Sequence, residues 1–159
     1  YEYADNGERA IFYARGVLET VKKLRWRPDV IHCQGWISAV VPLYIKTAFK
    51  DEPSFNGTKV VFEVNNVKLK DNLPGNFSSC LATRNVTKAF LKKENMKFES
   101  PDDLLKLGVK FSDALILGTN DASKEVVDFA ESNGKPVLPF MENPDYPSYY
   151  GEFYEKLLS

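Results

Sequence analysis

Apolar residues gather in four short runs along the chain, and stretches of helical periodicity separate these runs. The runs lie near residues 29–33, 59–64, 114–118 and 136–139. Aliphatic and β-branched residues stand at neighbouring positions in each run, which is typical of strands buried on both faces of a parallel sheet. Strands that alternate with helices predict an α/β fold with right-handed crossovers. We therefore expect a three-layer, Rossmann-like domain with a mostly parallel sheet.

Helical patterns fill the chain between the runs. Ile11, Ala14, Leu18 and Val21 recur at helical spacing and predict a helix with one buried face, for which Asp5 is the expected N-cap. Further helices are expected over residues 36–50, 87–93 and 149–158, after Ser100, and from Thr119 or Asn120 to Ser132.

Local signals mark the ends and interiors of three of these helices. Ser100 is followed at the third position by Asp103, which is the spacing of a capping box. Gly134 stands where a helix commonly ends in a left-handed residue. Pro42 lies inside the pattern over residues 36–50 and predicts a kink, because proline lacks the backbone N–H that the helix requires.

Polar side chains lie at or just after the ends of the first two runs, where the predicted strands end. Ligands of open α/β sheets bind outside the carboxyl ends of strands, at points where the strand order reverses. Uncharged amides suit ligand hydroxyl groups because each amide offers donors and an acceptor. Tryptophan can stack on the apolar face of a ligand. We therefore predict a substrate-binding site formed by His32, Gln34, Gly35, Trp36, Asn65 and Asn66.

Each of these residues also has a structural interpretation. His32 can serve as a hydrogen-bonded core histidine, and Trp36 can pack the start of a helix against the sheet. Turn and cap roles are the alternative for Asn65 and Asn66. Aromatic residues near the end of the chain form either a stacking platform for a ligand or a helix that covers the core: Tyr146, Tyr149, Tyr150, Phe153 and Tyr154.

Charge and composition exclude several classes of partner. The 159 residues carry a formal net charge of −1, with a sequence pI of about 5.9, so the chain lacks the basic field that nucleic acid binding requires. Apolar runs are much shorter than the roughly 20 residues that span a bilayer, and we expect no membrane partner. A local basic patch is interpreted as a solvated face: Lys88, Lys92, Lys93 and Lys97.

Metal and disulfide chemistry are not indicated by the sequence. The chain has one histidine and two cysteines, without the close spacing of a zinc site. Cys33 lies in the first apolar run, which predicts a buried thiol rather than a disulfide partner. We expect no metal site and no cofactor.

Several short segments, taken in order, resemble the bacterial glycogen synthase and plant starch synthase family. These segments are Asp5-Asn6 with Arg9, Pro28 to Cys33 with Trp36, Val61-Phe62 with Asn66, and Phe111-Ser112-Asp113-Ala114. The resemblance covers nearly the whole chain, as part of the N-terminal domain of a two-domain GT-B fold. It implies a cytoplasmic enzyme that transfers glucose from ADP- or UDP-glucose to an α-1,4-glucan with retention of configuration.

The chain departs from the family pattern at positions that matter for catalysis. The family usually has His-Asp where this sequence has Gln34 and Gly35, and that aspartate belongs to the catalytic cleft. A histidine that contacts the donor glucose is replaced by Asn65. The family's Lys-Thr-Gly-Gly loop, its N-terminal strands and its C-terminal nucleotide domain are not found in this sequence. No catalytic residue is therefore assigned.

Two functions stay open at this point, beside a plain scaffold with no ligand. Residues 1–159 are expected to form a single Rossmann-like domain of a glycogen or starch synthase-like glucosyltransferase, inactive as this isolated chain. The alternative is a non-catalytic relative that binds glucan or a sugar nucleotide. A second Rossmann-like domain encoded after Ser159 would distinguish the two. If the family's first strands are missing, the sheet has an unprotected edge, and we expect either a homo-oligomer or contact with a missing segment at that edge.

Overall fold

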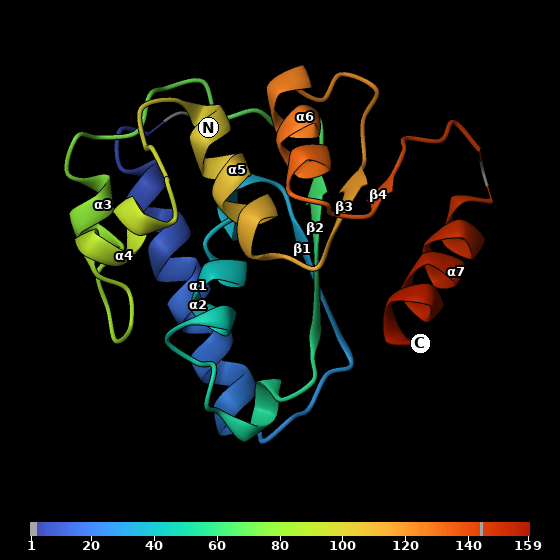
Figure 1. Cartoon of the computed structure of the whole chain (residues 1–159), viewed down its shortest axis with the longest axis horizontal. Helices are drawn as coiled ribbons and strands as arrows, with labels where there is room; N and C mark the ends of the chain where they lie inside the picture. The colour runs from blue at the N-terminus through green and yellow to red at the C-terminus, as the bar shows by residue number, and fades with distance from the viewer. Residues whose placement is uncertain (1–2, 144) are drawn as a thin grey trace.

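A single parallel sheet forms the centre of the molecule. The computed structural model describes residues 3–143 and 145–159. The strands are β1 (Val30–Gln34), β2 (Lys59–Val64), β3 (Ala114–Leu117) and β4 (Val137–Leu138), in the order β1-β2-β3-β4 and all parallel (Figure 1). All four predicted strands are confirmed. β4 is shorter than predicted because Pro136 and Pro139 flank it and cannot donate to the ladder.

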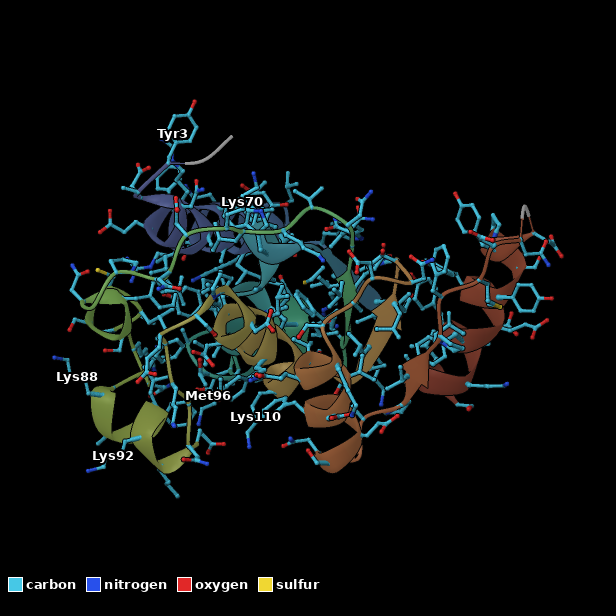
Figure 2. The ribbon with its side chains drawn as sticks, turned by 90° about the horizontal axis from the view of Figure 1, so that it is seen from above. Tyr3, Lys70, Lys88, Lys92, Met96 and Lys110 are labelled. Atoms are coloured by element: carbon cyan, nitrogen blue, oxygen red, sulfur yellow. The ribbon has the colours of Figure 1, made fainter. Side chains whose placement is uncertain are left out.

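Helices cover both faces of the sheet. They are α1 (Asn6–Lys23), α2 (Val41–Lys46), α3 (Phe77–Cys80), α4 (Lys88–Lys93), α5 (Pro101–Phe111), α6 (Lys124–Ser132) and α7 (Tyr146–Leu158), with 3₁₀ turns η1 (Trp36–Ser38) and η2 (Pro53–Phe55). α1, α2, α5 and α6 lie on one side of the sheet and α7 lies alone on the other, as Figures 1 and 2 both show. The predicted three-layer α/β fold is thus confirmed.

Two apolar cores of unequal size hold the layers together. The larger core joins the sheet to α1, α2 and α5, and its fully buried side chains include Leu18, Tyr44 and Phe62. α5 approaches the sheet closely at Gly108, where a Cβ would lie 2.8 Å from the Phe62 ring. The smaller core lies under α7 and consists of Val61, Ala114 and Ile116, with Tyr150, Phe153, Tyr154 and Leu157 of α7 packed against it.

The strand order corrects one expectation about the site. Among the described residues the order never reverses, and β1 is the first strand of the sheet. The polar residues that follow β1 and β2 therefore lie at the carboxyl end of a sheet edge, and not at a reversal within the described strands. The strand order therefore does not indicate a ligand site at this edge, and only the side chains there can do so.

Helix ends agree with the sequence in some places and differ in others. Ser100 and Asp103 form the predicted capping box, with Ser100 N–H 2.9 Å from Asp103 Oδ2. Gly134 has φ +64 at the end of α6, as predicted. α6 begins at Lys124, after N-cap Ser123, and not at Thr119 or Asn120. The Ser123 hydroxyl instead bonds to Asp102 Oδ2 at 2.5 Å, which joins the starts of two helices.

Three other helical predictions are wrong in detail. The helix expected over residues 36–50 divides into η1 and the shorter α2. Pro42 lies in the first turn of α2, where its missing N–H would have no intrahelical acceptor, so no kink results. Asp5 makes no cap hydrogen bond, because its carboxylate accepts from Arg9 Nε at 2.9 Å.

The basic patch on and after α4 lies on the outside of the molecule. Lys88, Lys92, Lys93 and Lys97 are all exposed. Figure 2 shows Lys88 and Lys92 pointing away from the body of the protein. This arrangement agrees with a solvated face.

Candidate functional site

The predicted site residues divide between two hollows, because neighbouring side chains of a strand point to opposite faces. His32 and Gln34 of β1 lie on the face covered by α7. Gly35, Trp36 and Asn65 follow the strand ends and face α5 and α6. Asn66 is exposed and lines neither of these two hollows. The single site predicted from the sequence therefore corresponds to two separate groups of residues in the structure.

The first hollow, here called the strand-end pocket, lies between the ends of β1 and β2 and the starts of α5 and α6. Its volume is about 450 Å³. Its polar lining residues are Asn65, Lys68, Ser100, Asp102, Asp121, Ser123 and Glu125, beside Gly35 and Trp36. An amide, two hydroxyls and an indole ring are thus brought together, and these groups suit a hydroxyl-rich ligand.

Gly35 and Asn65 are fitted to each other at the mouth of this pocket. Gly35 has φ +71, and a Cβ at this position would lie 2.9 Å from Asn65 Nδ2. The Gly35 N–H donates to the Glu63 carbonyl at 2.9 Å, and Asn65 Oδ1 accepts from the Val67 N–H at 3.0 Å. Both backbone segments are therefore fixed. Position 35 cannot carry a side chain while Asn65 keeps its place.

Negative charge dominates the lining of the strand-end pocket. Asp102, Asp121 and Glu125 contribute three carboxylates, against the single ammonium group of Lys68. Lys68 is paired with Asp121 at 2.6 Å. A phosphate group would meet mostly like charge here, whereas a neutral sugar would not.

The second hollow, here called the α7 pocket, lies between α7 and the sheet and has a volume of about 640 Å³. Glu63 stands at its centre, only 5% exposed. Its carboxylate accepts hydrogen bonds from His32 Nε2 at 2.8 Å, Gln34 Nε2 at 2.8 Å and the Tyr150 hydroxyl at 3.3 Å. A Cβ at Gly118 would lie 2.9 Å from Glu63 Cδ, so the neighbouring strand end leaves room for this carboxylate.

Hydrogen bonding keeps Glu63 ionised despite its burial. Burial alone would raise the pKa of the Glu63 carboxyl, but the hydrogen bonds from His32, Gln34 and Tyr150 lower it overall. Burial and the nearby Glu63 charge raise the pKa of Tyr150 to about 12. Tyr150 therefore keeps its proton at neutral pH and donates it to Glu63.

His32 connects the sheet to α7. Its Nε2 faces Glu63, and its Nδ1 lies 2.6 Å from the Tyr154 hydroxyl oxygen. The carboxylate requires a donor, so we assign the Nε2–H tautomer, with Nδ1 accepting from Tyr154. A chain of hydrogen bonds then runs from Tyr154 through His32 to Glu63.

Sequence reasoning missed Glu63 as a site component, and it considered Tyr150 and Tyr154 only as aromatic rings and not as hydrogen-bonding partners of Glu63 and His32. Glu63 did carry a signal, since it is the one charged residue between Val60 and Val64 in an otherwise apolar strand. A carboxylate at such a position needs hydrogen-bonding partners. The partners could not be found from sequence, because Tyr150 is 87 residues away.

The described part of the chain shows neither a metal-binding cluster nor a membrane-spanning helix. Over residues 3–143 and 145–159, no group of three or more His, Cys, Asp or Glu side chains could hold a metal ion. Both cysteines are free, and Cys33 is buried as predicted. No helix in the same ranges is long and apolar enough to cross a membrane.

Comparison with known proteins shows where the chain belongs. Glycogen synthase of Desulforudis audaxviator is 29% identical over 126 residues, which are 79% of this chain and 25% of that protein. Glycogen synthase 2 of Geobacter metallireducens is 29% identical over 133 residues, which are 84% of this chain and 27% of that protein. The chain thus spans about a quarter of the length of these curated relatives.

A solved structure and a family model agree with these relatives. The catalytic domain of starch synthase IV from Arabidopsis thaliana, bound to ADP and acarbose, has the same fold, with a TM-score of 0.68 and 17% identity. The similarity covers 94% of this chain and 32% of that one. The family model of the starch synthase catalytic domain matches residues 1–137. Because this match covers most of the sequence, the chain belongs to the starch synthase catalytic domain family.

Proposed function

We propose that residues 1–159 form one domain of a glycogen or starch synthase-type glucosyltransferase, and that this domain binds α-glucan but does not transfer glucose by itself. The donor of the whole enzyme would be ADP-glucose or UDP-glucose, and its place the cytoplasm. The family match supports the chemistry, and the starch synthase IV structure supports ADP and an oligosaccharide as ligands of such an enzyme.

The observation that carries the proposal is the fit between Gly35 and Asn65. The strand-end pocket offers Trp36 and Asn65 to a sugar, but Asn65 fills the space in which a side chain at position 35 would stand. The carboxylate that the family usually has there cannot be accommodated. The pocket is therefore suited to holding a sugar and lacks one of the groups that act on it.

Charge gives a second reason to expect no transfer. Departure of a nucleoside diphosphate requires positive charge at the leaving phosphate. Within residues 3–143 and 145–159, Lys68 is the only cationic residue that lines the strand-end pocket, and its ammonium group is held by Asp121. The diphosphate would thus find no free cation among the lining residues.

Tryptophan fluorescence tests the binding half of this proposal. The chain has two tryptophans, and Trp26 is 60% exposed on the loop after α1, so Trp26→Phe leaves Trp36 as the only indole. Maltotriose should change the Trp36 emission with a saturable dependence on concentration. ADP-glucose should change it less, because of the acidic lining. An unchanged emission at high millimolar maltotriose would contradict glucan binding at this pocket.

A radiolabelled transfer assay tests the proposal that this chain does not transfer glucose by itself. No label from ADP-glucose or UDP-glucose should enter glycogen above background. The double variant Gly35→Asp with Asn65→His should also stay inactive, since the diphosphate still lacks its cations. Incorporation by the unmodified chain would overturn the inactive assignment and leave the family assignment untouched.

A further inference from the structure

We propose that the α7 pocket is a second, separate binding site, which takes a neutral sugar unit. The strand-end pocket and the α7 pocket share none of their lining residues. They lie on opposite faces of the sheet. The inference stands on the side chains around Glu63 and does not require the function proposed above.

The neighbourhood of Glu63 is shaped around its carboxylate. Its neighbours on the same face of β2 and β3 are apolar, including Val61 and Ile116. An apolar side chain at position 63 would pack there without any desolvation cost. Instead, Gly118 leaves the space for the carboxylate, and three donors from β1 and α7 converge on it. Such a constellation in a cavity is more typical of a site than of a packed core.

Glu63 acts here as a positioning residue. Gln34 donates one amide hydrogen to Glu63, which turns its amide oxygen and second hydrogen toward solvent, and Gln34 is exposed. Tyr150 donates its only hydroxyl hydrogen, so its oxygen lone pairs are left to accept. The groups offered to a ligand are therefore an oriented amide and a hydroxyl, and not the carboxylate charge.

Aromatic rings complete the rim of the pocket. Tyr146 is 52% exposed and Phe140 is 36% exposed, and both line the hollow. Tyr146 lies edge-on to Tyr150, with ring centroids 5.6 Å apart, so the position of its face is fixed. Ring faces beside amide and hydroxyl groups match a sugar, which has apolar C–H faces and hydroxyl edges.

Charge selects against other ligand classes. Among the described residues that line the α7 pocket, only Glu63 and His32 are acidic or basic, so a phosphate would meet negative charge. A small cation would compete with three donors that already surround the carboxylate. A neutral polyhydroxylated ligand meets neither penalty.

Proton and nitrogen NMR of His32 can test this inference at the site itself. His32 is the only histidine of the chain, so its imidazole signals need no further assignment. Titration with D-glucose and with maltotriose should shift these signals saturably. Tyr150→Phe, which removes only the hydroxyl, should weaken binding about fivefold to tenfold, as expected for one hydrogen bond. Tyr149→Phe is the matched control on the same helix, and it should leave the affinity unchanged.

Further variants separate this site from the strand-end pocket. Trp36→Phe should leave the His32 response intact, even if binding at the strand-end pocket is lost. Glu63→Gln should abolish the response while circular dichroism shows an unchanged fold. No shift with either sugar, a stronger shift with inorganic phosphate or choline, or loss of the shift in Trp36→Phe would each overturn the proposal.

Discussion

Gly35 shows how a single residue limits what a site can do. Its φ of +71 lies in the left-handed region, and Asn65 occupies the direction in which a side chain would point. Gly35→Ala should therefore destabilise the fold by about 1–3 kcal/mol, from backbone strain together with the contact to Asn65. Urea denaturation measures this difference directly.

Gly57 supplies the matched control for that measurement. It has φ +81, but a Cβ there would meet nothing within 4 Å. Gly57→Ala should cost only the backbone strain, and thus less than Gly35→Ala. Replacing Asn65 by Ala in the Gly35→Ala background should recover part of the difference. Equal costs at the two glycines would mean that Asn65 does not restrict position 35.

The two cysteines should differ sharply in reactivity. Burial raises the pKa of the Cys33 thiol to about 12, so almost no thiolate forms at neutral pH. Cys80 is only partly buried. A thiol reagent should label Cys80 in the native protein and reach Cys33 only after denaturation. A Cys80→Ser variant that is still labelled rapidly when folded would show that Cys33 is accessible.

At this scale the sequence revealed positions but not partnerships. His32, Gln34 and Asn65 were identified because they lie at or just after the ends of apolar strands. The contact of Gln34 and His32 with Glu63 depends on strand register and side-chain direction, which a single sequence does not show. Tyr150 was recognised as part of an aromatic helix, but its bond to Glu63 requires the fold.

Among the secondary-structure elements, α5 has the clearest local determinants. Its capping box was predicted, and Ser100 N–H and Glu99 N–H each lie 2.9 Å from Asp103 Oδ2. α2 and α6 were less well predicted. Pro42 was expected to kink a longer helix, but α2 begins at Val41, so Pro42 lies in its first turn. Ser123 is the N-cap of α6, but its hydroxyl makes no cap hydrogen bond and donates to Asp102 of α5.

The capping box should make stability depend on pH. Partial burial would raise the pKa of Asp103, but hydrogen bonds from the Ser100 and Glu99 backbone lower it overall. A lowered pKa in the folded state means that the contribution of Asp103 is present above its ordinary pKa and is lost as the pH falls through the folded value. Asp103→Asn should cost about 1 kcal/mol at neutral pH and progressively less in acid.

Chemical denaturation at several pH values checks this expectation. Asp128→Asn is a suitable control, because Asp128 is an exposed residue paired only with Lys124 on the surface of α6. Its effect should be small at every pH. A constant cost of Asp103→Asn across the acidic range would contradict a role for the ionised carboxylate.

For the whole molecule, the layer architecture could be predicted and the surfaces could not. Apolar runs and helical periods sufficed for a parallel sheet between helices. Whether the strand order reverses was beyond the sequence, because each crossover leaves the choice of edge open. An unprotected edge was expected from the sequence; the structure identifies it as the outer edge of β1 and adds the exposed apolar face of α1.

These two surfaces lead to a prediction about self-association. No strand among the described residues pairs with the outer edge of β1. On α1 and the loop after it, Phe12 is 81% exposed, Leu24 is 69% exposed and Trp26 is 60% exposed, and they border an apolar hollow of about 430 Å³. Open edges and contiguous apolar patches favour association. The chain should therefore dimerise as its concentration rises.

Light scattering and sedimentation velocity test this expectation with charged variants. Phe12→Glu together with Leu24→Glu should shift the protein to the monomer, because each carboxylate would have to be desolvated in the interface. Leu158→Glu is the control, since Leu158 is 48% exposed on α7, away from α1. A protein that is monomeric at high concentration, or one whose association survives the α1 variants, would show that the apolar face of α1 does not drive assembly.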